Sequence, residues 1–190
     1  MASVLVVTHP EVNIDPATPV PQWGLSEVGA DRMQTFAGSP AVAKLAAIWS
    51  SAETKAVEAA GILSATLSLS ARVEPDLHEN DRSATGYLVE AEFQKMADAF
   101  FANPEQSVRG WERAVDAQAR MAAAVDRCLA ASSPGDVAIV GHGGVSALLL
   151  CKLLGEPIAR AFDQPFAGCY WTFDRETREV TARWKPIAPR

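Results

Sequence analysis

Hydrophobic residues in this chain follow two patterns, continuous runs and helical repeats. The runs 4–7 and 137–140 are apolar throughout and rich in Val and Ile, as in strands buried on both faces of a sheet. Shorter β-rich segments predict two more strands and a C-terminal hairpin, at 47–50, 71–74, 168–174 and 180–184. Apolar residues at helical spacing predict helices at about 25–36, 53–63, 90–101, 111–131 and from 145 onward.

The order of these elements alternates strands with helices along most of the chain. Such alternation is typical of an α/β fold, in which helices cover both faces of a mostly parallel sheet. The expected architecture is therefore a three-layer α/β/α sandwich. Since the chain has 190 residues and shows no linker or repeat, we expect one domain over residues 1–190.

A histidine stands at the end of each of the two fully apolar runs. His9 is followed by Pro10, which lacks an N–H and ends the strand. His142 lies among three glycines, which permit close backbone approach, and the helix that follows offers free N–H groups, Gly143 first, to an anion. Because open α/β sheets bind ligands at the carboxyl ends of their strands, we expect both imidazoles at one site.

Two further charged residues could belong to such a site. Lys55 lies in the first turn of a predicted helix, where the helix dipole disfavours a cation unless an anion binds nearby. Glu79 lies in a polar loop after the third predicted strand. Either residue could equally be a solvated surface group. As a set with the histidines, they suit phosphoryl transfer through a phosphohistidine, with a carboxylic acid to protonate the leaving oxygen.

Composition narrows the classes of partner. The net charge of −6 argues against nucleic acid, although a local cationic pocket could still hold a small anion. Three separate cysteines suggest a reducing compartment. With no signal-peptide pattern and no apolar segment long enough to cross a bilayer, we expect a cytoplasmic protein that does not associate with membranes.

Five motifs in the same order along the chain resemble the histidine phosphatase superfamily, also called phosphoglycerate mutase-like. They are Val4 to Pro10 (family Arg-His-Gly), Leu25 to Gly29 (Leu-Thr-x-x-Gly), Ser50 to Ala60 (Ser-Ser-x-x-x-Arg-Ala-x-x-Thr-Ala), Leu77 to Glu79 (Leu-x-Glu) and Val140 to Val145 (Val-x-His-Gly-Gly-Val). Each motif is weak alone, but five in order are specific for the fold.

The resemblance implies a role for each matching residue. His9 would be the phosphorylated nucleophile, Glu79 the proton donor and His142 a ligand of the transferring phosphoryl group. Lys55 would take the place of the family's second arginine. Residues 80–111 would form a cap over the pocket, which sets substrate choice in this family. The implied function is a phosphatase that acts on a small phosphorylated molecule without a metal or other cofactor.

The chain departs from the family at the residues that hold phosphate. Thr8 stands in place of the first arginine and Pro10 in place of the glycine after the histidine. Lys55 keeps a charge but cannot form the bidentate fork of an arginine. Activity could therefore be reduced. The missing donors could be supplied by Arg82, by the hydroxyl of Thr8 or by Asn13, whereas Arg82 could also form a surface ion pair with Asp81 or Glu79.

Other functions stay open at this point. A relative with weak or no catalysis could bind an anion or a protein partner, which the changes at Thr8 and Pro10 favour. A metal-dependent hydrolase lacks the expected short ligand spacing, and a serine hydrolase lacks G-x-S-x-G. Phosphatase and mutase activity are not separated by sequence alone. The C-terminal hairpin offers an edge strand that could pair across a homodimer.

Overall fold

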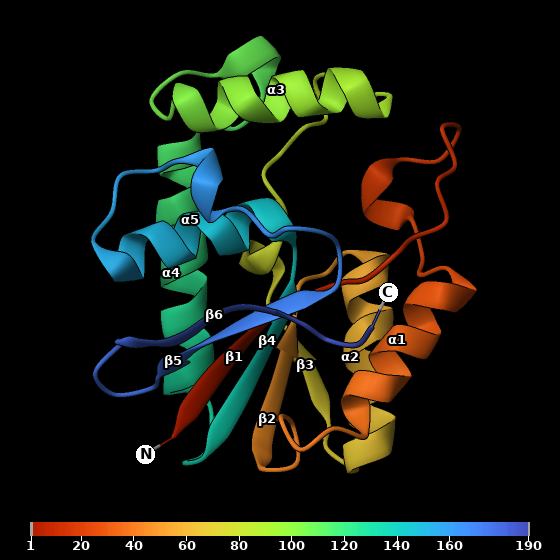
Figure 1. Ribbon diagram of the computed structural model, residues 1–190, viewed down its shortest axis with the longest axis vertical. Helices are drawn as coiled ribbons and strands as arrows, with labels where there is room; N and C mark the ends of the chain where they lie inside the picture. The colour runs from red at the N-terminus through yellow and green to blue at the C-terminus, as the bar shows by residue number, and fades with distance from the viewer. Residues whose placement is uncertain (1, 190) are drawn as a thin grey trace.

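The computed structural model, which describes residues 2–189, contains one mixed sheet of six strands (Figure 1). The strands are β1 (Ser3–Thr8), β2 (Leu45–Ser50), β3 (Ala71–Val73), β4 (Asp136–Gly141), β5 (Cys169–Asp174) and β6 (Val180–Pro186). Their spatial order is β3-β2-β4-β1-β5-β6. The first four in that order are parallel, and β5 and β6 join as an antiparallel hairpin at one edge.

Helices cover both faces of the sheet, so the predicted three-layer α/β/α fold is confirmed. The helices are α1 (Glu27–Ala37), α2 (Thr54–Leu67), α3 (Glu90–Ala102), α4 (Ala114–Ala130) and α5 (Gly143–Leu154), and the 3-10 turns are Val20–Gln22, Pro75–Leu77, Val108–Gly110 and Arg160–Phe162. In Figure 1, α1 and α2 lie on one side of the sheet and α4 and α5 on the other, while α3 lies across the end where the parallel strands finish.

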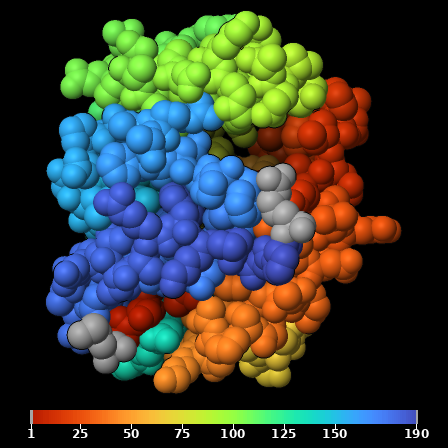
Figure 2. Space-filling model, in the orientation of Figure 1, coloured from red at the N-terminus to blue at the C-terminus, as the bar shows by residue number. Residues whose placement is uncertain are grey.

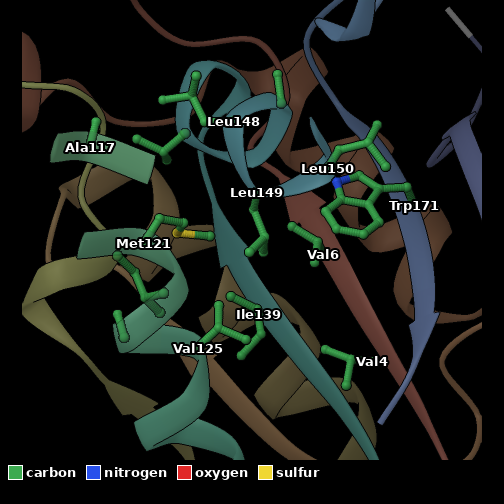
Figure 3. Close-up of a cluster of buried hydrophobic side chains, with 14 of the residues drawn as sticks. Val4, Val6, Ala117, Met121, Val125, Ile139, Leu148, Leu149, Leu150 and Trp171 are labelled. Carbon is green, nitrogen blue, oxygen red and sulfur yellow. The ribbon is translucent and has the colours of Figure 1, made fainter. Parts of the chain in front are cut away.

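Each face of the sheet has its own hydrophobic core, because successive side chains of a strand point to opposite faces. Val4 and Val6 of β1 pack with α4 and α5, in the cluster drawn in Figure 3 around Met121, Ile139 and Trp171. Alternate residues of the same strands pack against α1 and α2, in a cluster that includes Leu5, Val7, Phe36, Ile48 and Leu63. The two buried faces explain why the central strands are apolar at every position.

Register places the two histidines together. β1 and β4 are parallel neighbours, with Thr8 opposite Gly141. His9 and His142 follow directly, so both leave the sheet at its carboxyl edge. The predicted pairing of these strands is therefore observed, and the site lies under α3.

Some predicted boundaries differ from the observed ones. The fourth long helix begins at Ala114 rather than Trp111, because Val108–Gly110 forms a separate 3-10 turn in which Arg109 and Gly110 have positive φ. The fifth begins at Gly143 with His142 as its N-cap, two residues before the predicted start. Within residues 2–189 no helix has both the length and the apolar character to cross a membrane.

Candidate active site

His9 is held in one tautomer by its own backbone neighbour. Its Nδ1 lies 2.8 Å from the carbonyl oxygen of Pro10. Because a carbonyl can only accept a hydrogen bond, Nδ1 carries the proton and Nε2 keeps its lone pair. Pro10 therefore ends β1 and also orients the imidazole. The same arrangement leaves Nε2 of His9 as an unprotonated nitrogen.

His142 is fully buried and faces His9, with ring centroids 5.3 Å apart. Its Nε2 lies 2.7 Å from the hydroxyl of Ser51, which itself accepts the N–H of Glu53. In the tautomer in which the Ser51 hydroxyl donates to Nε2, the ring proton of His142 lies on Nδ1. That buried Nδ1 has no hydrogen-bond partner among residues 2–189. In this tautomer Nδ1 is a donor available to an anion at His9.

Both imidazoles are neutral at physiological pH. Burial, together with the neighbouring His142, lowers the pKa of His9 from 6.5 to about 3. Burial also lowers the pKa of His142, although Glu53 and Glu79 oppose that shift. A neutral imidazole is the form that can attack phosphorus.

Lys55 lies at the start of α2, but its charge is already paired. It is only 3 % exposed, and its Nζ lies 2.6 Å from Oε2 of Glu53 and 2.8 Å from the carbonyl oxygen of Val20. The anion that a lysine at a helix start requires is thus supplied within the chain. The local sequence around Lys55 does not reveal this neutralisation, because it depends on the side-chain conformation of Glu53.

Glu53 connects the groups of the site. It is the N-cap of α2, and Ser50 before it ends β2. Its carboxylate faces inward: Oε1 accepts the N–H of Glu79 at 3.0 Å and lies 3.5 Å from Nε2 of His142. Glu53 was not predicted as a site residue, because its carboxylate meets these partners only in the folded chain.

Glu79 lies at the N-terminus of α5. Its two carboxylate oxygens accept the N–H groups of Gly144 and Val145 at 3.1 and 3.0 Å, and one also accepts that of Asn80. A carboxylate at the positive end of a helix dipole is stabilised there. These contacts bring Glu79 beside the His142 turn, as expected for a residue of the same site.

Thr8 is buried, and its hydroxyl is already hydrogen-bonded within the chain. Its hydroxyl is bonded to the side-chain oxygen of Gln164 and accepts the N–H of Cys169 at 3.0 Å. The amide nitrogen of Gln164 lies so near Gly143 that a Cβ on Gly143 would come within 2.3 Å of it. Gln164 was not predicted as a site residue, because it lies in a loop without a recognisable motif. Gly143 itself opens α5, with its N–H unbonded within the described chain.

Arg82 lies in the loop after Glu79 and stacks on two rings of the cap. Its guanidinium lies 5.0 Å from the ring centre of Phe93 and 5.7 Å from that of Trp111. In the part of the chain that the structure describes it forms no ion pair, so the alternative pairing with Asp81 or Glu79 is not observed. Asn13 instead donates to the carbonyl oxygen of Leu25 within the N-terminal loop.

A cavity of about 620 Å³ adjoins these groups. It lies between the loop 16–21 and the segment 78–87, and Glu53, Glu79 and Arg82 line it. Figure 2 shows the recess between the green α3 region and the red N-terminal segment. The proline-rich loop after His9 therefore forms a rim of the site. Between residues 2 and 189, no cluster of three or more His, Cys, Asp or Glu is arranged to hold a metal ion.

Fold and site together define an α/β protein that carries paired histidines and two carboxylates at the carboxyl edge of its sheet. The chain belongs to the histidine phosphatase superfamily (branch 1), whose family model matches residues 17–182. The matched region contains Lys55, Glu79 and His142, and it begins after His9. No curated protein matches the sequence.

Solved structures share the fold at low sequence identity. A mycobacterial glucosyl-3-phosphoglycerate phosphatase in complex with inorganic phosphate is 21% identical, with a TM-score of 0.76 over 97% of this chain and 95% of that one. Bacillus stearothermophilus YhfR is 20% identical, with a TM-score of 0.79 over 95% and 94%. The α-ribazole phosphatase of Shigella flexneri is 16% identical, with a TM-score of 0.68 over 95% and 94%.

Proposed function

We propose that the protein is a phosphatase that hydrolyses a phosphoric monoester of a small molecule through a phosphohistidine on His9. The single observation that carries the proposal is the imidazole of His9, held neutral with Nε2 unprotonated and facing His142. Membership of the histidine phosphatase superfamily supports it. Two of the structural neighbours are named as phosphatases, one of glucosyl-3-phosphoglycerate and one of α-ribazole phosphate, and these names also support phosphatase activity.

In the first step, Nε2 of His9 attacks phosphorus and the bond from phosphorus to the ester oxygen breaks. Glu79 enters this step as the protonated carboxylic acid and donates its proton to the departing oxygen, which leaves as an alcohol while Glu79 becomes a carboxylate. In the second step a water molecule attacks the phosphohistidine while Glu79 takes its proton. Inorganic phosphate leaves and His9 returns to its starting form.

Donors around His9 would hold the phosphoryl oxygens. The Nδ1–H of His142 and the N–H of Gly143 are directed to the site without requiring a charge. Lys55 and Arg82 supply the cations, Lys55 from α2 and Arg82 from the loop that leads into the cap. The hydroxyl of Thr8 contributes through the amide of Gln164, which it orients.

The rest of the substrate would occupy the cavity of about 620 Å³ between the loop 16–21 and the segment 78–87. Residues 80–111 then act as a cap on a single domain rather than as a second domain. Apolar residues of the proline-rich loop line one side of the cavity, and polar and charged residues, among them Asp81 and Arg82, line the other. This lining suits a small organic phosphoester better than a phosphoprotein segment.

A second candidate function is binding of an anion or a protein partner with little or no catalysis. The observation that favours it is the ion pair between Lys55 and Glu53, which cancels a phosphate-binding charge. Thr8 removes another cation relative to the family pattern. Retention of His9, Glu79 and His142 in one site favours the enzyme.

Hydrolysis of p-nitrophenyl phosphate by the wild type and by His9→Ala tests the mechanism. Substitution should lower kcat by about 10³-fold or more, since the attacking nitrogen is lost. A quenched reaction should carry acid-labile phosphate on the peptide that contains His9. His78→Ala, a change at the remaining histidine, should still be labelled at His9. Undiminished turnover in His9→Ala would rule out the phosphohistidine, and inactivity of the wild type on a broad phosphoester panel would favour the binding function.

A further inference from the structure

The charge balance at the phosphoryl site is unusual because a carboxylate lies inside it. Lys55 and Glu53 are both buried, with side chains 3 % and 10 % exposed, and their Nζ and Oε2 atoms are 2.6 Å apart. The other oxygen of Glu53 is 3.5 Å from His142. Glu53 thus contacts the cation and lies close to the imidazole on which the proposed phosphate site depends.

We propose that Glu53 sets the anion affinity of this site by competing with the phosphoryl group for Lys55. The inference rests on the proposed function for the identity of the ligand, a phosphoryl group or inorganic phosphate. A phosphoryl oxygen that reaches Lys55 must displace Oε2 of Glu53 or lie beside a like charge. The competition makes the site selective for ligands whose remaining contacts, in the cavity and at Arg82, compensate for the weakened phosphate shell.

Glu53 carries its charge under all physiological conditions. Burial alone would raise the pKa of Glu53, but the neighbouring His142 and Lys55 and the N–H of Glu79 together lower it to about 2. The ion pair with Lys55 and the N–H of Glu79 favour the charged carboxylate whichever form His142 takes. The Glu53 carboxylate therefore keeps its negative charge next to the place where an anionic ligand would bind.

The contacts of Glu53 show that it need not be held permanently in place. Oε2 has Lys55 as its partner, and Oε1 has a backbone N–H. As the N-cap of α2 it makes no side-chain cap to the helix, so its rotation would not unwind the first turn. Lys55 would keep its hydrogen bond to the carbonyl oxygen of Val20 while it donates another to a phosphoryl oxygen.

Titration of the whole protein with inorganic phosphate at pH 7 tests the competition. Glu53→Gln removes the charge at constant size and should bind phosphate at least about tenfold more tightly than the wild type. Glu58→Gln is the matched control, since Glu58 lies on the same helix, is exposed and also accepts a backbone N–H, that of Leu25. Its affinity should equal that of the wild type. The double variant Glu53→Gln/Lys55→Gln should lose the gain.

Equal or weaker phosphate binding by Glu53→Gln would overturn the proposal, and so would a gain that persists in the double variant. Circular dichroism and thermal unfolding establish that each variant is folded. Should Glu53→Gln fail to fold, Glu53→Met, which keeps the length of the side chain, provides the same comparison.

The two proposals fail in different ways. If the wild type turns over p-nitrophenyl phosphate through His9 while Glu53→Gln binds phosphate no more tightly, only the competition is wrong. If no variant turns over a phosphoester but Glu53→Gln binds phosphate more tightly, the phosphatase function is wrong and the competition for Lys55 holds.

Discussion

The hydroxyl of Thr8 is bonded to Gln164 and to the backbone of Cys169, so position 8 reaches the site only through the Gln164 amide. A neutral amide beside Gly143 would replace the charged donor that the family has at this position. Such a donor orients a phosphoryl oxygen but contributes less electrostatic stabilisation than a guanidinium. A weaker set of donors for the phosphoryl oxygens agrees with a site in which the charge of Lys55 is also neutralised.

Thr8→Val should release the Gln164 side chain while keeping the shape of the residue. Because a buried hydrogen-bonding hydroxyl is removed, we expect a loss of about 1–3 kcal/mol in the free energy of unfolding, measured with urea. Thr8→Val and Gln164→Leu should weaken phosphate binding by similar factors, and the double variant should be no weaker than either. The control is Thr172→Val, the same change at a half-buried position of the neighbouring strand β5. Additive losses would show that Thr8 acts independently of Gln164.

The candidate site residues that follow a strand or a helix start could be predicted from the sequence, whereas those placed by long-range contacts could not. His9 and His142 were predicted to meet because each ends an apolar strand run. Gln164 is 156 residues from Thr8 along the chain, in a loop without a motif, so no local pattern marks it. No local pattern marks Glu53 as a site residue either, since only the fold brings its carboxylate to Lys55.

At the scale of elements, the start of α5 positions most of the residues of the candidate site. His142 is its N-cap, Gly143 and Gly144 form its first turn, and the N–H groups of residues 144 and 145 hold Glu79. A side chain at Gly144 has no room, because its Cβ would lie 2.8 Å from Oε1 of Glu79. The glycine is therefore needed for close approach rather than for an unusual backbone conformation.

Gly144→Ala should displace Glu79 and lower kcat about tenfold or more, since small misplacements of a catalytic group reduce the rate strongly. Gly61→Ala in α2 is the matched control, because a Cβ there meets nothing within 4 Å. It should raise the free energy of unfolding by about 0.5–1 kcal/mol with no change in kcat. Kinetics and thermal unfolding of both variants provide the measurement. Unchanged turnover in Gly144→Ala would mean that the position of Glu79 is not critical.

Most helices and strands could be predicted from the sequence, because the spacing of hydrophobic residues reflects which positions are buried. The six strands and five helices all correspond to predicted segments. The helix boundaries were less accurate where turns intervene. Val108–Gly110 interrupts the approach to α4 through two residues of positive φ, which the surrounding sequence does not signal.

For the molecule as a whole, the two neutral histidines link stability to pH. The pKa of His9 is about 3 in the folded chain and 6.5 when exposed, and the pKa of His142 is also lowered. Between these values the unfolded chain binds protons that the folded chain does not. Stability from this source is therefore complete above pH 6.5 and decreases as the pH falls toward 3.

His9→Asn removes one of the two groups and should flatten this dependence. Between pH 6 and pH 4 we expect the slope of unfolding free energy against pH to fall by up to about 1.4 kcal/mol per pH unit. Urea unfolding of both proteins across this range measures the difference. Parallel curves for wild type and His9→Asn would show that His9 titrates normally.

The position of β1 has a consequence for biosynthesis. β1 is synthesised before β4 and β5, yet it lies between them, so Val4 pairs with Val137 and Phe173. During translation its apolar residues have no partner strand until β4 has been made. The nascent chain must therefore keep an aggregation-prone segment unpaired over this interval, and the edge of the sheet that carries His9 and His142 can form only afterwards.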